Sequence, residues 1–242
     1  MKKPYVKKIT DISKFAVWLV DGQYVRTKLD EEFTNFGQHY RFRFIPRNEF
    51  WIDHLHAPGE EHFYIDHLLI ENRLMAAGMD YDQALEKADR AELKERRKVD
   101  FLRRGPASRR TSPLVIRKIH RQLLRSYSQG LRVWVVRGEL VRDMFFIDFT
   151  EGGHDLVYKF VPPGEVWLDD DLRRTERPFV LLHEVHERHL MAQGLDYPHA
   201  HRSASHLEYF CRHHPRELRK KLAEELRKNR DSLSPRGSAQ EA

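Results

Sequence analysis

The strongest constraint on this chain is an internal repeat. The segment VWLVDGQYVR, which begins at Val17, aligns with VWVVRGELVR, which begins at Val133. The alignment continues without a gap to Glu92 and Glu208, with a constant offset of 133 − 17 = 116 residues. Roughly a third of the paired positions are identical, far above chance for a gapless stretch of this length. The sequence therefore indicates a tandem duplication, and each copy is expected to fold into the same small unit.

Each copy begins with segments that favour strands. VWLVDGQYVR has two β-prone runs around Asp21-Gly22, the pattern of a hairpin turn. HYRFRFIP alternates as a strand does and stops at Pro46, and EFWID is a further short strand. The second copy has LVYKFVP and EVWLD in the corresponding places. We therefore expect a small antiparallel sheet at the start of each copy.

Two helices are expected after each sheet. EEHFYIDHLLIENRLMAAG and ERPFVLLHEVHERHLMAQG both carry apolar residues at helical spacing. Their terminal glycines, Gly78 and Gly194, are typical of the position just after a helix. A second helix follows in each copy, with Asp80 or Asp196 as its N-cap. The predicted fold class is α+β: a tandem repeat of a small antiparallel sheet followed by two helices.

The duplication suggests four stretches of chain. We expect a first repeat over residues 1–92, a basic helical linker over residues 93–132, a second repeat over residues 133–228 and a disordered tail over residues 229–242. Within the linker, GPASRRTSP is the best candidate for an exposed break.

Composition restricts the setting in which the protein works. The single cysteine, Cys211, excludes an internal disulfide and favours a reducing compartment. No segment approaches the ~20 apolar residues that cross a bilayer, and the basic N-terminus lacks the apolar run of a signal peptide. We expect a cytoplasmic protein without a membrane partner. The net charge of +6, concentrated in residues 93–125, makes a nucleic-acid partner possible through counterion release.

The ionisable residues of the helical half that are identical in both copies include the caps Asp80 and Asp196 and three further residues in each copy. The three are His183, Glu187 and Glu208 in the second copy, and His67, Glu71 and Glu92 in the first. His183 and Glu187 are four residues apart, so they project from one face of a helix. Glu208 comes from the next helix, and this N/O/O set suits zinc, or manganese or iron. The structural alternative is a His–Glu pair on the helix surface, with Glu208 bound to a linker arginine.

The second copy alone carries further groups for chemistry. Glu184 follows His183 directly, where the first copy has Leu68. In zinc hydrolases with a His-Glu-x-x-His motif, this glutamate accepts a proton from a water whose pKa the metal lowers from ~16 to about 7. His186 or His201 would stabilise an oxyanion, although His186 fits a surface position equally well. His201 is also an alternative third ligand, with Glu208 hydrogen-bonded behind it.

The His-Glu-x-x-Glu motif of residues 183–187 resembles the zincin metallopeptidases, in particular the branch whose third ligand is a glutamate on the following helix. In that branch the glutamate follows the second ligand by some twenty residues, and here the spacing is 208 − 187 = 21. The small sheet before the motif helix is also similar, and the resemblance covers about 45 residues per copy. It implies cleavage of a peptide or protein substrate. Glu187 departs from the family, which has a second histidine there, and an extra carboxylate makes the metal less electrophilic.

Three functions are compatible with these residues. The first is a metal-dependent hydrolase of peptide or amide bonds, with zinc as the expected ion, an active second repeat and a degenerate first one. The second is a non-catalytic duplicated protein, structural or bound to nucleic acid through residues 93–125. The third pools the ligands of both copies into a dinuclear iron or manganese site, which leaves Glu184 unexplained.

Overall fold

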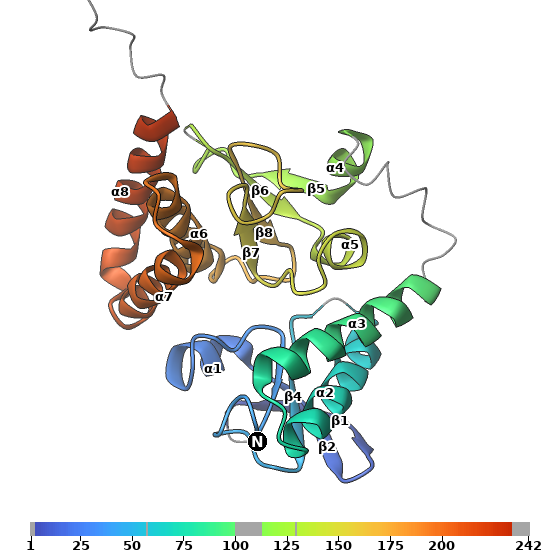
Figure 1. Cartoon of the computed structure of the whole chain (residues 1–242). Coiled ribbons are helices and arrows are strands. Elements are labelled where there is room, and N and C mark those ends of the chain that lie inside the picture. Colours follow the sequence, from blue (N-terminus) through green and yellow to red (C-terminus); the bar gives the residue numbers. More distant parts are fainter. Residues whose placement is uncertain (1–2, 57, 100–112, 129, 234–242) are drawn as a thin grey trace, which may run out of the picture. The chain divides into compact units, whose positions relative to one another are not determined.

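The computed structural model describes residues 3–56, 58–99, 113–128 and 130–233 (Figure 1). The chain divides into two compact units. The first contains Met1–Ile116 and Gly138–Thr150, and the second contains Arg117–Arg137 and Glu151–Ala242. The units do not coincide with the repeats, because a segment of the second repeat belongs to the first unit.

The first unit contains a four-stranded mixed sheet and helices that follow it. Its strands are β1 (Tyr5–Ile12), β2 (Phe15–Val20), β3 (Phe36–Gln38) and β4 (Glu49–Asp53). Its helices are α1 (Gly22–Lys28), α2 (Glu61–Ala76), α3 (Tyr81–Val99) and α5 (Gly138–Met144). The sheet order is β1-β2-β4-β3, with β2 parallel to β4 and the other pairs antiparallel.

The second unit repeats this order of strands. The boundary between the units falls within α4 (Pro113–Ile119). The strands of the second unit are β5 (His120–Leu123), β6 (Arg132–Val136), β7 (Gly152–His154) and β8 (Glu165–Asp169). Its further helices are α6 (Arg177–Ala192), α7 (Tyr197–His213) and α8 (Pro215–Leu233). The sheet order is β5-β6-β8-β7, and α6 packs against both α7 and α8.

The register of the two sheets is the same. Trp18 lies opposite Trp51 in the first sheet, and Trp134 lies opposite Trp167 in the second. All four partners are related by the offset of 116 residues found in the sequence. The α+β fold class is confirmed, and the matching registers are those expected of a duplicated unit.

The prediction of purely antiparallel sheets is wrong. Asp21 and Gly22 do not form a hairpin turn; they begin α1, because the Asp21 carboxylate caps the helix by accepting from Tyr24 N at 3.1 Å. The chain then crosses over and returns through β4, parallel to β2. In the second repeat, α5 follows β6 at the equivalent place in the sequence, so the Arg-Gly pair there also starts a helix.

The predicted strand HYRFRFIP is also absent, since residues 39–46 form turns. Its apolar residues serve the core instead: Phe42 and Ile45 are buried. A Cβ at residue 37 would lie 2.6 Å from the Phe42 ring, so this position of the first repeat has no room for a side chain larger than that of Gly37. The alternating apolar residues of this segment therefore pack into the core from a loop and do not form a strand.

The predicted helices and caps are confirmed. EFWID and EVWLD form β4 and β8, and the two long apolar segments form α2 and α6. Gly78 and Gly194 follow these helices with φ of 93° and 95°. The carboxylates of Asp80 and Asp196 accept from the backbone of the next helix, α3 and α7 respectively.

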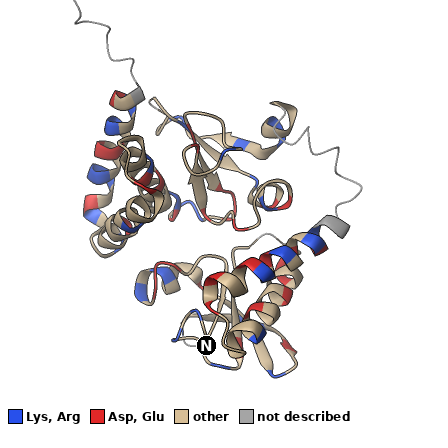
Figure 2. Cartoon of the chain, in the orientation of Figure 1, with Lys and Arg blue, Asp and Glu red and all other residues tan. Residues whose placement is uncertain are grey.

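Charged side chains cover the long outer helices. Lys and Arg alternate with Asp and Glu along α3 and α8 (Figure 2). The stretch expected to be a helical linker includes β5, which pairs with β6, and Arg121 of β5 binds Asp170 at 2.5 Å. The expected break GPASRRTSP lies mostly outside the described residues, as does most of the tail. None of the described helices is both long and apolar enough to cross a bilayer.

The helical reading of Asp21-Gly22 predicts a specific effect on stability. Asp21→Ala removes the N-cap and should lower the free energy of unfolding by about 1 kcal/mol, whereas Asp21→Ser should retain most of it. Urea denaturation followed by circular dichroism measures both variants. Equal stability of the two variants would contradict the capping role.

Candidate metal centre

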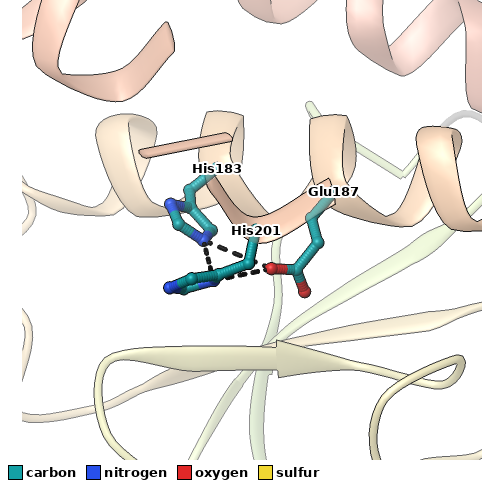
Figure 3. Close-up of side chains that lie close together, drawn as sticks. All are labelled: His183, Glu187 and His201. Carbon is teal, nitrogen blue, oxygen red and sulfur yellow. Dashed lines mark hydrogen bonds and ion pairs between the residues drawn. The ribbon is translucent and has the colours of Figure 1, made fainter. Parts of the chain in front are cut away.

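Helix α6 presents His183 and Glu187 on one face, and α7 brings His201 to the same place. The Nε2 atom of His183 lies 3.1 Å from Nδ1 of His201 and 3.5 Å from Oε2 of Glu187. The third side of this triangle, from His201 Nδ1 to Glu187 Oε2, is 2.8 Å. Figure 3 shows the three side chains pointing toward one another. Two helices thus bring two ring nitrogens and one carboxylate oxygen together.

These distances fit a shared metal ion. A metal–ligand distance of about 2.1 Å places neighbouring ligand atoms roughly 3.0–3.5 Å apart, for octahedral to tetrahedral angles. The observed edges of 2.8, 3.1 and 3.5 Å agree with this within a few tenths of an ångström. The side chain of Glu187 is 4% exposed and that of His201 is 34% exposed, so the group is open to solvent on the His201 side.

Glu208, expected in the ligand set, contacts the other nitrogen of His183. Its Oε2 lies 3.0 Å from Nδ1 of His183, on the far side of the ring from Nε2. Its Oε1 accepts from Arg212 at 2.6 and 2.9 Å. Burial raises the pKa of Glu208, but His183 and Arg212 outweigh it and hold the pKa at about 2. The ionised Glu208 therefore orients His183, and His201 takes the third position of the triangle.

A residue that sequence reasoning missed, His154, orients Glu187. The backbone N–H of Leu156 donates to Nδ1 of His154 at 3.2 Å, so the ring proton is on Nε2. Nε2 then donates to Oε1 of Glu187 at 3.0 Å. His154, Glu184 and Glu187 have ligand atoms close enough for an ion, but a protonated Nε2 is a donor and not a ligand.

The hydrogen bonds from these histidines control the charge of Glu187. Burial disfavours its ionised form, yet the hydrogen bonds of His154 and His183 hold the pKa of Glu187 far below its usual value. Burial opposes a charge on His183 as well, but Glu187 and Glu208 raise its pKa well above the usual value. The site therefore favours a positive charge at Nε2 of His183, which a metal ion would also supply.

Glu184 lies next to the triangle, with a carboxylate oxygen within 4.8 Å of one of Glu187. Burial and the charge of Glu187 raise the pKa of Glu184 to about 8. Gly152 makes room for it, because a Cβ at residue 152 would lie 3.0 Å from Oε1 of Glu184. A carboxyl group with this pKa can hold a proton and release it near neutral pH.

His186, the other proposed oxyanion donor, faces a different helix. Its Nδ1 lies 3.2 Å from Glu225 of α8, and its Nε2 contacts the hydroxyl of Ser203 at 3.0 Å. These contacts join α6 to its neighbours in the helical layer. His186 is therefore not part of the triangle.

The first repeat preserves the contacts that orient the histidine and the first glutamate of this site, here called the outer contacts. Glu92 lies 2.9 Å from Nδ1 of His67, and Arg96 donates to Glu92 at 2.8 Å. Gln38, at the position of His154, donates its amide to Glu71 at 2.7 Å. Different residues thus perform the same task in the two repeats. An N–H donor at equivalent positions was the signal that would have identified His154 in the sequence.

The first repeat lacks the inner groups. Leu68, Leu85 and Phe36 stand where the second repeat has Glu184, His201 and Gly152. His67 contacts Glu71 through Nε2 at 3.4 Å and Glu92 through Nδ1, so the three expected ligands do not meet at one point. Although burial opposes it, the two carboxylates raise the pKa of His67 to about 10. A proton therefore occupies this ring at neutral pH.

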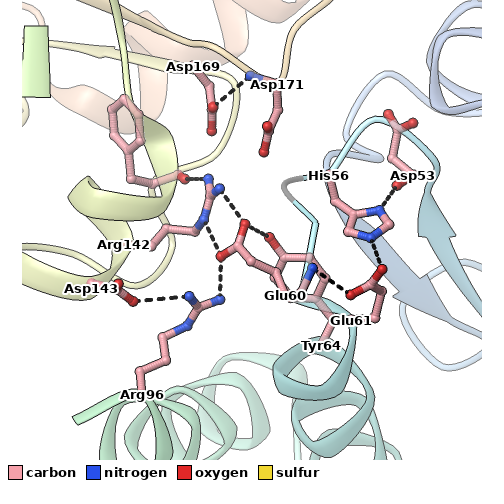
Figure 4. Close-up of polar contacts among 12 residues, drawn as sticks. Asp53, His56, Glu60, Glu61, Tyr64, Arg96, Arg142, Asp143, Asp169 and Asp171 are labelled. Atoms are coloured by element: carbon pink, nitrogen blue, oxygen red, sulfur yellow. Dashed lines mark hydrogen bonds and ion pairs between the residues drawn. The ribbon is translucent and has the colours of Figure 1, made fainter. Parts of the chain in front are cut away.

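Arg96 continues into a buried ion network at the start of α2. It contacts Glu60 at 2.7 Å and Asp143 at 3.2 Å, and Arg142 of α5 contacts the same Glu60 at 2.7 Å (Figure 4). Glu60 is 2% exposed. In the second repeat, Arg212 likewise joins Glu176 at 2.8 Å to Glu208. In both repeats, a buried arginine thus links the glutamate that orients the histidine to a second buried glutamate at the start of the preceding helix.

Comparison of the chain with protein-family models, curated proteins and solved structures finds no significant match.

The network around Glu60 predicts a stability that depends on pH. Burial raises the pKa of Glu60, but Arg142 and Arg96 outweigh it and hold the pKa below the usual 4.5. Its stabilising contribution is therefore complete above pH 4.5 and is lost as the pH falls through the lowered folded-state pKa. At pH 7, Glu60→Gln leaves two buried cations poorly paired and should lower the free energy of unfolding by about 3–5 kcal/mol.

Urea denaturation at pH 7 and in acid measures this difference. Glu86→Gln is the matched control, because Glu86 pairs with Arg90 on the exposed face of α3 and should cost less than about 1 kcal/mol. The difference in the free energy of unfolding between the wild type and Glu60→Gln should become smaller in acid. A gap that is the same at both pH values would contradict the pairing.

Proposed function

We propose that the second repeat is a metal-dependent hydrolase of peptide or amide bonds. The observation that carries the proposal is the triangle of His183 Nε2, Glu187 Oε2 and His201 Nδ1, with the carboxyl group of Glu184 beside it. Zinc is the expected ion, and manganese or iron(II) would also accept this donor set. The reducing compartment indicated by the buried free thiol of Cys211 fits a cytoplasmic enzyme.

The composition of the triangle supports a hydrolytic centre. Two imidazoles and one carboxylate are the protein ligands of many catalytic zinc sites, which keep a further position open. The zincins that this motif resembles use the same composition, with a different order along the chain. With His201 in place of Glu208, the set has one carboxylate and leaves the ion more electrophilic than the expected set of one histidine and two glutamates.

Each residue of the site has a distinct task in this proposal. A bound divalent ion would polarise a substrate carbonyl and make a water molecule acidic. Glu184 would accept the proton of the attacking water and pass it to the leaving nitrogen. Glu208 and His154 would hold His183 and Glu187 in their binding orientations. The partly exposed side of His201 is where a substrate would enter.

The proposal predicts one metal ion per chain, bound by the second repeat. His183→Ala and His201→Ala should each abolish stoichiometric binding, because each removes a ligand. Glu208→Gln should only weaken binding, by about 10–100-fold, because it removes a supporting hydrogen bond. Elemental analysis of protein purified without chelator or a nickel column gives the stoichiometry, and competition with a chromogenic chelator gives the affinity.

His67→Ala is the matched control, since the equivalent histidine of the first repeat should not affect the metal content. Loss of metal in Glu208→Gln with retention in His201→Ala would assign the third ligand to Glu208. Wild-type protein without any metal would favour the non-catalytic alternative instead.

The role of Glu184 predicts a separation of binding from turnover. Glu184→Gln should keep the metal and reduce cleavage of an internally quenched peptide library by about 10²–10⁴-fold, because the proton acceptor is lost. Gly152→Ala should also retain the metal and lose activity, because the new methyl group displaces the Glu184 carboxyl group. Full activity in Glu184→Gln, or loss of its metal, would contradict this role.

A further inference from the structure

A cavity of about 760 Å³ lies beside helix α8 in the second unit. Three parts of the chain line it: one face of α8, Pro178 at the start of α6, and Ser126 and Tyr127 of the connection between β5 and β6. Because three elements supply its walls, we call this cavity the α8 groove. Its volume falls within the range of ~300–1,000 Å³ that is usual for small-molecule sites.

The floor of the α8 groove is apolar. Leu222 is 4% exposed and belongs to the hydrophobic core of the second unit, and Tyr127, Leu218 and Leu226 pack against that core. The same four side chains line the groove. One side of each chain therefore contacts the core, and the other side offers apolar surface to a ligand.

The rim of the α8 groove is basic. Arg219, Arg227 and Arg230 are exposed and line the groove, whereas its described lining residues include no aspartate or glutamate. The lining residues of α8 recur every three or four positions, so they form one face of the helix. They are Pro215, Leu218, Arg219, Leu222, Ala223, Leu226, Arg227 and Arg230.

The glutamates in the middle of α8 are paired outside the groove. Glu224 contacts Lys221 at 3.8 Å, and Glu225 contacts Lys228 at 2.7 Å. Among the residues that the structure describes, Arg219 and Arg227 form no ion pair with a carboxylate. Their guanidinium groups can therefore bind an anionic ligand, for which the planar fork of arginine is well suited.

The combination of floor and rim selects one class of ligand. A cation would meet three arginines and no carboxylate of the lining. An inorganic anion would leave the leucine floor uncovered, and a purely apolar molecule would leave the arginines unused. A ligand that matches both parts has an anionic group attached to an apolar chain.

We propose that the α8 groove binds a medium-chain carboxylic acid in its ionised form. Arg227 receives the carboxylate, with Arg230 one helical turn further on; Nε of Arg230 also contacts Asp231 at 3.2 Å. The chain of the ligand extends over Leu226 and Leu222 toward Pro215. This site is independent of the hydrolytic function proposed for the second repeat.

Isothermal titration of the full chain with octanoate, decanoate and dodecanoate, each below its micelle concentration, tests the proposal. One carboxylate should bind per chain, and each added methylene should tighten binding about 3–4-fold because it covers more of the leucine floor. The headgroup controls 1-octanol and octylamine should bind at least about 10-fold more weakly than octanoate, because neither carries a negative charge.

Two pairs of variants place the ligand in the groove. Arg227→Gln should weaken decanoate binding at least about 10-fold, whereas Arg216→Gln, an exposed change on the same helix outside the lining, should not. Ala223→Glu should abolish binding because it puts a carboxylate into the groove, and Ala223→Ser should retain it. Ala223 is exposed, so both of its variants should fold, which circular dichroism checks.

His183→Ala should leave the affinity for decanoate unchanged, since it alters only the proposed metal centre. Loss of binding in this variant would place the carboxylate on the metal ion and overturn the proposal. Failure of all three carboxylates to bind, equal binding of octylamine, or unchanged affinity in Arg227→Gln would also overturn it. Binding of phosphatidylglycerol vesicles without binding of any free carboxylate would assign the groove to a lipid surface instead.

Discussion

In each repeat, a hydrogen bond between a histidine of one helix and a glutamate of the next sets the orientation of the histidine ring. In the second repeat this bond joins Nδ1 of His183 to Glu208, and Arg212 keeps Glu208 ionised. Because Nδ1 is engaged on one side of the ring, Nε2 must face the other side, toward Glu187 and α7. The orientation of one imidazole therefore determines where a metal ion could bind.

The two repeats differ in what occupies the space beyond that imidazole. The second repeat fills it with His201 and Glu184, and Gly152 leaves room for the latter. The first repeat has leucines at the two equivalent helical positions and a proton on His67. Its outer contacts are intact, so the fold of the unit does not depend on the inner polar groups. The shared scaffold therefore accommodates different residues beyond the imidazole in the two repeats.

Much of the scaffold was predictable because its signals are local or repeated. Helical periodicity, terminal glycines and Asp caps identified α2, α3, α6 and α7 correctly. The Asp21-Gly22 pair was misread because a turn signal and a helix start use the same residues, and only the return of the chain through β4 distinguishes them. The HYRFRFIP segment was misread because alternation does not show whether apolar residues enter the core from a strand or from a loop.

The candidate site was predictable only in part. The spacing of four residues predicted that His183 and Glu187 share a helix face. The choice of third ligand depends on which nitrogen of the His183 ring is contacted: Glu208 contacts Nδ1, and His201 contacts Nε2. His154 was missed because its counterpart is Gln38, and the similarity lies in the N–H donor and not in the residue type. Equivalent positions that share a hydrogen-bond donor but not a residue type can be recognised only when the contacts of each side chain are known.

The most direct test is a crystal structure of the zinc-loaded protein with anomalous data collected at the zinc edge. The account predicts one anomalous peak about 2.0–2.2 Å from Nε2 of His183, Oε2 of Glu187 and Nδ1 of His201, with Glu208 still bound to Nδ1 of His183. A peak coordinated by Glu208 in place of His201, or no peak at this position, would contradict it.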